Sequence, residues 1–278
     1  MPWHTRTFFV EVLLHMITNT VKHRLKQGQP AVGLWVSFPS PAVVELLATI
    51  GPDWLLVDTE HGPTGWERLE DLLRAMKGTE VVPLVRVAAN DVALIKQALD
   101  RGAYGVIVPL VNTAQEARAA VAAARYPPEG IRGVAGTRVS RYGMDLPEYF
   151  ARWNSEVLVV CQVETAQALE HVEEIAAVPG VDVLFIGPND LSANLGCFRQ
   201  FDHPAFLAAV DRILAAARRC GIAAGYMAGS PEEVLRRIDQ GILFIAAGSD
   251  ARLLAGAAAA TYGRIREGLA ERLNVSRR

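Results

Sequence analysis

The sequence predicts a single-domain α/β protein whose eight parallel strands close into a (β/α)8 TIM barrel. Apolar runs alternate with helical patterns along the chain, and most of these runs are continuous in Val, Ile and Leu. Continuous apolar runs are typical of strands that are buried on both faces of a parallel sheet. Eight strand–helix units in 278 residues also match the size of this fold. A doubly wound open sheet is the alternative, but it would favour a GxGxxG turn after the first strand, and the sequence has none there.

Strands are expected where a short apolar run is bounded by polar or turn-forming residues. In chain order, the predicted strands are Ala31–Ser37, Trp54–Thr59, Val81–Val87, Tyr104–Val108, Val157–Val163, Val181–Ile186, Ile222–Met227 and Ile242–Ala247. Helical stretches separate them: Ser40, Thr113 and Ser230 stand at N-cap positions, and Gly78 and Gly102 follow helix ends. The predicted helices are Pro41–Ile50, Trp66–Lys77, Asp91–Arg101, Ala114–Arg125, Thr165–Ala177, Pro204–Cys220, Pro231–Gln240 and Ala251–Leu273.

The connection from Tyr126 to Glu156 is longer than the others and rich in glycine. Its arginines include Arg132, Arg138 and Arg141. Long loops on the catalytic face of a barrel are often functional. We therefore expect this connection to lie at the site and to influence which substrate binds.

Composition and charge describe an ordinary globular chain. Hydrophobic residues make up 51%, charged residues 21%, and the formal net charge is -2, so nucleic-acid binding is not expected. Cys161, Cys197 and Cys220 show no CxxC spacing, which indicates reduced thiols in the cytoplasm. No apolar run approaches the roughly 18 residues of a membrane span. Residues 1–17 are predicted to form an N-terminal extension rather than a signal peptide, and residues 18–278 to form the barrel domain.

Two carboxylates follow neighbouring strands at the point where each strand ends. Glu164 comes directly after Val157–Val163, and Asp190 follows Val181–Ile186 by a short turn. The C-terminal strand ends of a barrel meet on one rim and build its active site. Two hard oxygen ligands aimed at one point suit a divalent cation that keeps several waters. Each residue also has a structural interpretation: Glu164 would cap the helix that starts near Thr165, and Asp190 would be the N-cap of a short turn beginning at Leu191.

Other strand ends bring polar groups to the same rim. The side chains expected there are Trp35, Asp58, Glu60, His61, Arg86 and Gln162. His61 has an intrinsic pKa suited to acid–base work near neutrality, and Asp58, three residues earlier, is predicted to orient its ring. Arg86 has no acidic neighbour in sequence, so we expect it to meet an anionic ligand or partner. Taken alone, His61 could equally be a polar loop residue.

Several segments together resemble the HpcH/HpaI aldolase family, which comprises class II, metal-dependent pyruvate aldolases of the 4-hydroxy-2-oxoheptanedioate and 2-keto-3-deoxy sugar acid type. The resemblance runs from about Thr18 to about Ile265. The segments that carry it are Gly33-Leu34-Trp35, Val57-Asp58-Thr59-Glu60-His61-Gly62, Leu84-Val85-Arg86-Val87, Gly130-Ile131-Arg132-Gly133, Gln162-Val163-Glu164-Thr165 and Gly187-Pro188-Asn189-Asp190-Leu191-Ser192. The DxEHG and GPxDLS segments, with QxET between them, make the resemblance specific.

The resemblance implies the catalytic roles. It implies Mg2+ or Mn2+, with Co2+ as a further option, bound by Glu164 and Asp190. It implies that Arg86 contacts the pyruvate oxygen, and that His61 with Asp58 serves acid–base chemistry through water.

The resemblance also implies how the substrate and the subunits are held. Gln162 would lie near the keto group, and Trp35 would form an apolar wall. The turn that faces the pyruvate carboxylate with its backbone N–H groups would consist of Gly187, Pro188, Asn189 and Asp190. Asn189 stands where many relatives have a small residue. A hexamer of swapped dimers is implied, and the small residues Ala255–Ala260 favour a helix contact in such an oligomer or against the chain's own barrel.

These residues predict reversible cleavage of a 4-hydroxy-2-oxo acid into pyruvate, or a related 2-oxo acid such as hydroxypyruvate, and an aldehyde, through a metal-bound enolate. No lysine lies at a strand end, as a Schiff-base aldolase would require. The alternative is a CoA-ester lyase of the citrate-lyase or malyl-CoA type, in which arginines of the long connection would contact CoA phosphates. A phosphoenolpyruvate mutase-like barrel would need a cysteine- and lysine-containing loop, and a non-catalytic module would not need these polar strand ends.

Overall fold

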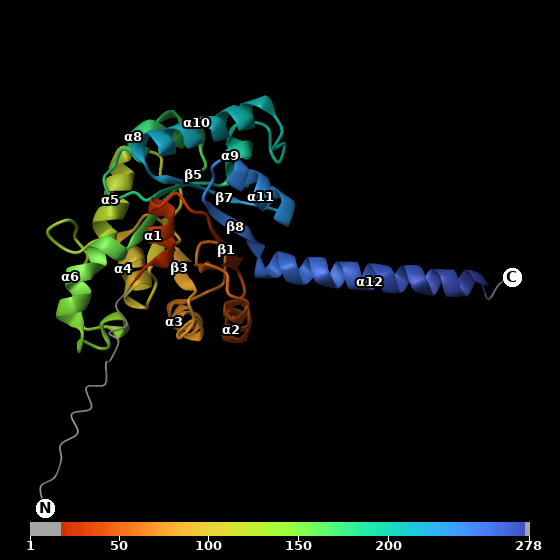
Figure 1. The fold of residues 1–278 in the computed structure, drawn as a ribbon, viewed down its shortest axis with the longest axis horizontal. Helices are drawn as coiled ribbons and strands as arrows, with labels where there is room; N and C mark the ends of the chain where they lie inside the picture. Colours follow the sequence, from red (N-terminus) through yellow and green to blue (C-terminus); the bar gives the residue numbers. More distant parts are fainter. Residues whose placement is uncertain (1–17, 276–278) are drawn as a thin grey trace, which may run out of the picture.

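The computed structural model describes residues 18–275 and confirms the predicted (β/α)8 barrel. Its parallel strands pair in chain order, and β8 returns to pair with β1, which closes the sheet (Figure 1). The strands are β1 (Ala31–Val36), β2 (Trp54–Asp58), β3 (Val82–Arg86), β4 (Gly105–Val108), β5 (Leu158–Val163), β6 (Val183–Ile186), β7 (Ala223–Met227) and β8 (Phe244–Ser249). Each overlaps a predicted strand, and closure excludes the open-sheet alternative.

Helices surround the barrel. They are α1 (Thr20–Lys26), α2 (Pro41–Ile50), α3 (Trp66–Ala75), α4 (Val92–Asp100), α5 (Ala114–Ala124), the 3-10 turn η1 (Arg138–Ser140), α6 (Leu146–Glu156), α7 (Ala166–Glu170), α8 (Val172–Ala176), α9 (Pro188–Asn194), α10 (Pro204–Cys220), α11 (Pro231–Asp239) and α12 (Asp250–Val275). The predicted N-caps Ser40, Thr113 and Ser230 are confirmed by their hydrogen bonds. The predicted helix Thr165–Ala177 is divided at His171, and α1, α6 and α9 are additional. Short helices depend on tertiary packing, so local patterns predict them poorly.

Apolar side chains form two layers, one inside the barrel and one between the strands and the surrounding helices. Inside, Trp54 stacks on Phe244 with ring centroids 4.4 Å apart, and Phe185 meets Phe244 edge-on at 6.1 Å. Outside, the opposite strand faces pack under the helices, and Cys161 is buried there. Gly33 makes room for the inner layer, since a Cβ at this position would lie 2.1 Å from the Trp54 ring. The inner layer therefore depends on a glycine in β1.

Helix α1 closes the N-terminal end of the barrel. Lys22 is only 2% exposed, and its Nζ donates to the carbonyl of Val157 at 2.5 Å and to Asp182 Oδ2 at 3.1 Å. The side-chain amide of Asn19 donates to the carbonyls of Tyr104 and Glu156. These bonds join α1 to the segments that lead into β4, β5 and β6.

The long connection between α5 and β5 lies at the same N-terminal end, which corrects the expectation that it would reach the catalytic face. Helix α5 runs back along the barrel before the connection begins, so the chain is already at the N-terminal end there. Arg138 donates to the carbonyl of Arg101, directly after α4, at 2.5 Å. Arg141 pairs with Asp145 at 3.1 Å within the segment itself.

Arg132 organises this segment as a buried cation. It is 1% exposed, and its guanidinium carbon lies 4.6, 5.7 and 4.5 Å from the ring centroids of Tyr126, Tyr149 and Trp153. Its Nη2 donates to Asp100 Oδ1 at 2.6 Å. Arg132, Arg138 and Arg141 are therefore all engaged in structural contacts, which argues against the CoA-phosphate role considered for them.

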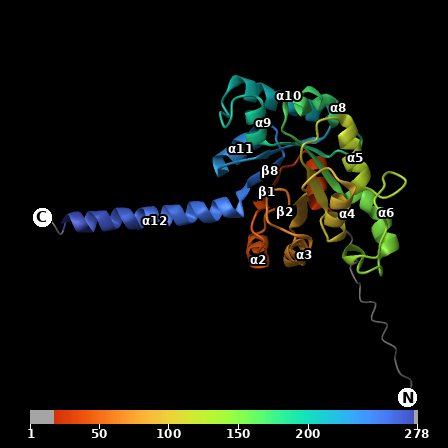
Figure 2. The ribbon, with the colours of Figure 1, turned by 180° about the vertical axis from the view of Figure 1, so that it is seen from behind.

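Helix α12 extends away from the barrel (Figures 1 and 2). Its start is anchored, because the Asp250 carboxylate accepts the backbone N–H groups of Ser37 and Phe38, each at 2.9 Å. Beyond this anchor the helix presents exposed apolar side chains, namely Leu253, Leu254, Tyr262, Ile265, Leu269 and Leu273. The alternative that this helix packs along its own barrel is therefore wrong.

Within residues 18–275, no helix combines the length and the apolar character that crossing a membrane requires. Cys161, Cys197 and Cys220 are unpaired, and the first two are buried. The extension predicted for residues 1–17 lies outside the described part of the chain.

Replacing Arg132 by methionine should destabilise the barrel. The Asp100 carboxylate would lose its charged partner, and breaking a buried pair costs about 3–5 kcal/mol; the partial exposure of Asp100 favours the lower end. Urea unfolding followed by circular dichroism measures the change. Arg141→Ala is the matched control, because its exposed pair with Asp145 should contribute less than about 1 kcal/mol. An Arg132→Met protein as stable as the wild type would contradict the structural role.

Candidate active site

The C-terminal strand ends bring the predicted residues onto one rim. Asp58 and Arg86 are direct partners in the β2–β3 register. Trp35, on β1, is buried beneath this pair at 4% exposure. His61 and Asp190 follow β2 and β6, and their side chains are exposed. The rim therefore contains two kinds of group. Asp58, Arg86 and Trp35 are buried, whereas His61 and Asp190 are exposed and a ligand can reach them.

Arg86 is held by two carboxylates at the end of β2. Its Nε and Nη2 donate to Asp58 Oδ1 at 2.9 Å and Oδ2 at 2.6 Å, and its Nη1 lies 2.7 Å from Glu60 Oε2. The guanidinium carbon is 5.0 Å from the Trp35 ring centroid. The anionic partner expected for Arg86 thus comes from the neighbouring strand. These contacts orient the guanidinium plane and leave some of its five N–H groups for another oxygen.

Asp58 is an anion that organises the loop after β2. Burial acts to raise its pKa, but the hydrogen bonds and charge of Arg86 and the backbone N–H groups of Glu60 and His61 outweigh burial, so the pKa lies below its usual range. The two N–H groups lie 3.0 and 3.3 Å from Oδ1. Asp58 therefore contacts the backbone of His61, whereas the sequence predicted that it would orient the imidazole ring.

Glu164 is a buried carboxylate at the end of β5. Its Oε1 accepts the backbone N–H of Leu110 at 2.8 Å, and its Oε2 accepts a hydrogen bond from Gln162 Nε2. Burial raises the pKa of Glu164, and the negative charges of Asp190 and Glu60 raise it further. The hydrogen bonds from Leu110 and Gln162 act in the opposite direction but do not outweigh these effects. The side chain therefore lies in surroundings that disfavour its negative charge.

Neither carboxylate has the capping role that was considered for it. Thr165 caps α7, because its hydroxyl accepts the N–H of Ala168 at 2.9 Å. Gly187 occupies the cap position of α9, so Asp190 lies inside the first turn and the helix does not begin at Leu191. Both capping interpretations are wrong, and both carboxylates remain available for a ligand.

Gly187 allows α9 to approach the end of β5 closely. A Cβ at this position would lie 2.7 Å from Glu164 Oε2 and 3.0 Å from Gln162 Nε2. Its φ of -85° is open to any residue, so the requirement here is for space rather than for backbone freedom.

The acceptors around Glu164 fit a divalent cation with water in its coordination shell. Gln162 Oε1 is a buried oxygen without a hydrogen-bond partner among the described residues, and Glu60 Oε2 is a buried oxygen whose contact is the ion pair with Arg86. Burial is the largest cause of the raised pKa of Glu60 and of Glu164, and the negative charge of Asp190 also acts to raise both pKa values. No three His, Cys, Asp or Glu side chains within residues 18–275 form a complete protein site. A cation beside Glu164 would therefore need water or substrate oxygens in its shell.

A family model described as HpcH/HpaI aldolase/citrate lyase matches residues 31–257, which include all eight strands. The chain belongs to this family. The match confirms the resemblance carried by the DxEHG, QxET and GPxDLS segments.

Individual known proteins are similar to most of this chain. A hydroxypyruvate/pyruvate aldolase of Sagittula stellata is 44% identical over 243 residues, which cover 87% of this chain and 96% of that protein. A 4-hydroxy-2-oxo-heptane-1,7-dioate aldolase of Escherichia coli is 41% identical over 248 residues, with coverage of 88% and 94%. The crystal structure of a family member from Burkholderia cenocepacia J2315 matches with a TM-score of 0.86 at 38% identity and covers 90% of this chain and 100% of the other.

Two residues of this HpcH/HpaI rim have contacts that the sequence did not assign. Leu110 has a left-handed φ of 53°, and its N–H bonds to Glu164. Its apolar surroundings in sequence contain no signal for that contact. Glu60 was expected on the rim without a role, and its ion pair with Arg86 now supplies one. The DxEHG segment placed Glu60 on the rim. Its partner Arg86 lies on β3, so the segment alone could not predict the ion pair.

Replacing Gly187 by alanine should disturb the site and leave the barrel folded. The new methyl group would displace Glu164 Oε2, and a displacement of about 1 Å can reduce activity about 100-fold. Steady-state kinetics of aldol cleavage measure the effect. Gly65→Ala is the control, because its φ is -80° and no atom lies within 4 Å of the added Cβ. An unchanged kcat/KM in Gly187→Ala would show that this close approach is not needed.

Proposed function

We propose that this HpcH/HpaI family member is a divalent-metal-dependent class II aldolase. It reversibly cleaves a 4-hydroxy-2-oxo acid into pyruvate, or a related 2-oxo acid such as hydroxypyruvate, and an aldehyde. The observation that carries the proposal is the oriented Arg86 guanidinium on the same rim as Glu164 and Asp190. The aldolases among the relatives support the same chemistry.

Glu164 and Asp190 are the proposed protein ligands of the cation. We propose Mg2+ or Mn2+, with Co2+ as a further option, because oxygen ligands and water suit these ions. When bound, the cation supplies Lewis-acid polarisation of the 2-oxo group. Gln162 supports this set, since its Nε2 donates to Glu164 and its Oε1 can accept a hydrogen bond from water beside the keto group.

The first turn of α9 is the proposed contact for the substrate carboxylate. Helix-start N–H groups have no intrahelical acceptor, so those of Asn189 and Asp190 are available. Pro188 has no N–H and fits the first helical position. Gly187 keeps this turn beside the proposed metal ligands, so one substrate can reach both.

Arg86 would stabilise the negative charge that develops on the 2-oxo oxygen as the C3–C4 bond breaks. Asp58 already orients the guanidinium, so no reorganisation is needed when the charge appears. A preorganised donor of this kind contributes more in the transition state than in the ground state. Trp35 forms an apolar wall beneath the guanidinium and limits the access of water.

His61 is the proposed acid–base residue. In cleavage, its imidazole would take the proton from the C4 hydroxyl, directly or through water, while the C4–O bond becomes the aldehyde carbonyl. In the reverse direction it would return that proton. Its exposed ring suits exchange with solvent, and Asp58 sets its position through the backbone N–H.

The lysines of the chain do not support a Schiff-base mechanism. Lys22 and Lys26 lie on α1 at the N-terminal end of the barrel, Lys77 follows α3, and Lys96 lies on α4. A Schiff-base aldolase would need a lysine at the catalytic rim. The arrangement therefore favours the metal route.

We also propose that two copies of the chain swap their α12 helices, so that each α12 packs on the barrel of the other copy. Three such swapped dimers would form the expected hexamer. The helix presents one apolar face at a spacing of three and four residues, formed by Leu254, Ala258, Tyr262, Ile265, Leu269 and Leu273. Its own barrel leaves apolar residues exposed on the helices next to β1 and β8, namely Leu46, Ile50 and Leu235. A swap of α12 between two copies would bury both the apolar face of this helix and the exposed apolar residues of α2 and α11.

Chelation should abolish the activity. With pyruvate and a panel of aldehydes, EDTA-treated protein is expected to form no 4-hydroxy-2-oxo acid, and added Mg2+, Mn2+ or Co2+ to restore formation. Full turnover in chelator would overturn the metal requirement. Parallel incubation with CoA esters tests the alternative: cleavage of CoA esters alone, without aldol addition, would overturn the aldolase proposal.

Replacing His61 by alanine should slow aldol cleavage about 100- to 10,000-fold, the usual contribution of a general acid–base group. Pyruvate binding, measured by calorimetry, should change little, because the proposed contacts to pyruvate come from other residues. His171→Ala is the control, since this histidine lies between α7 and α8. A wild-type cleavage rate in His61→Ala would remove this residue from the mechanism.

Charges on the apolar face of α12 should break the assembly. The double variant Ile265→Glu with Leu269→Glu is expected to sediment as a smaller species than the wild type in analytical ultracentrifugation. Glu267→Gln lies on the opposite side of the helix and should leave the assembly intact. A monomeric wild type, or a double variant that assembles normally, would contradict the exchange.

A further inference from the structure

A cavity of about 470 Å3 opens at the N-terminal end of the barrel. Its walls include Val181 and Asp182 before β6, and Ile222 before β7. Glu164 and Asp190 follow the opposite ends of β5 and β6. The cavity is therefore separate from the proposed active site and has no role in the reaction described above.

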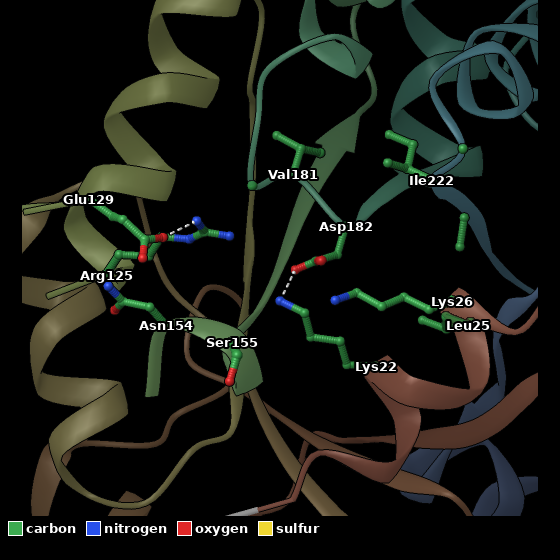
Figure 3. A pocket seen from close by; sticks show the side chains of 13 residues that line it. Lys22, Leu25, Lys26, Arg125, Glu129, Asn154, Ser155, Val181, Asp182 and Ile222 are labelled. Atoms are coloured by element: carbon green, nitrogen blue, oxygen red, sulfur yellow. Dashed lines mark hydrogen bonds and ion pairs between the residues drawn. The ribbon is translucent and has the colours of Figure 1, made fainter. Parts of the chain in front are cut away.

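Three basic side chains converge on this cavity (Figure 3). Helix α1 contributes Lys22 and Lys26, and the end of α5 is followed by Arg125. Figure 3 shows Lys26 and Arg125 directed from opposite walls toward the space beside the Lys22–Asp182 pair. Residues far apart in sequence thus build one basic surface.

The carboxylates of the cavity leave part of this positive charge unpaired. Lys22 pairs with Asp182 at 3.1 Å, and Arg125 Nη1 pairs with Glu129 at 2.6 Å. Among the described residues, no carboxylate pairs with Lys26, and Arg125 Nε is buried without a hydrogen-bond partner. The Lys26 ammonium, which has no carboxylate partner among the described residues, therefore lines the same cavity as the guanidinium of Arg125.

The basic groups also disfavour one another's charge. Burial lowers the pKa of Lys22, Asp182 opposes this, and the charges of Lys26 and Arg125 lower it further. Cations near the ends of α1 and α5 offset the helix dipoles. That effect explains why basic residues occur here, but it supplies no carboxylate for the Lys26 ammonium, and an anion between Lys26 and Arg125 would supply one.

We propose that this cavity binds a compact organic anion with two negative charges, a dicarboxylate or a phosphate monoester, separately from the substrate. Lys26 and Arg125 would recognise it directly, and the Lys22–Asp182 pair would form the floor. The volume is within the range of about 300–1,000 Å3 that small-molecule sites occupy. Charge-assisted hydrogen bonds from an ammonium and a guanidinium suit both kinds of oxyanion.

Calorimetric titration of the full-length protein tests the proposal. The probes are succinate and glycerol 3-phosphate, added with Mg2+ and saturating pyruvate, a monoanion that fills the proposed active site and lacks the second charge expected of the cavity's ligand. The expected result is binding of at least one probe to the wild type, weakened about tenfold or more in Lys26→Ala and in Arg125→Gln. The probe that binds distinguishes the dicarboxylate from the phosphate monoester. Lys77→Ala, an exposed lysine after α3, is the matched control and should bind like the wild type.

The outcomes do not depend on folding or on the aldolase assignment. Lys26 is exposed, so its substitution should leave the unfolding midpoint unchanged, whereas Arg125→Gln also loses the Glu129 pair. Binding is measured directly and would persist in a protein without aldolase activity. Failure of both probes to bind the wild type, or equal affinity in the wild type and Lys26→Ala, would overturn the proposal.

Discussion

Closure of eight parallel strands into one barrel is the constraint on which the rest of this structure depends. Because β8 pairs with β1, every strand end reaches one of two rims, and residues from distant segments become neighbours. The β2–β3 register sets Asp58 beside Arg86. The turn after β4 directs the N–H of Leu110 onto Glu164 at the end of β5. Local preferences alone would not produce either contact.

The neighbours of each buried charge decide what that charge can do at the rim. Burial acts to raise the pKa of both Asp58, at 4% exposure, and Glu164, at 3%. Arg86 reverses the effect for Asp58, whereas Asp190 and Glu60 add to it for Glu164. One carboxylate is therefore fixed in an ion pair that orients a donor. The other has surroundings that a bound cation would relieve, which suits a metal ligand.

The two ends of the barrel divide structural and chemical roles. At the N-terminal end, the buried cations Lys22 and Arg132 are matched by carboxylates and aromatic rings, and they hold α1 and the long connection in place. At the C-terminal rim, Gln162 Oε1 is buried without a hydrogen-bond partner in the part of the chain that the structure describes. The paired cations Lys22 and Arg132 give the N-terminal end a rigid frame, and the free acceptor of Gln162 gives the C-terminal rim capacity for a ligand.

The sequence by itself determined the barrel and the rim positions of Glu164, Asp190 and Arg86, because continuous apolar runs between helices favour a parallel sheet, and strand ends of a barrel share one rim. Only the tertiary structure decided the partners of Arg86, the N-terminal placement of the long connection and the extension of α12. Those features depend on strand register, on helix length and on contacts between residues far apart in the chain. Local sequence patterns report which faces are apolar, and they do not specify which distant groups those faces meet.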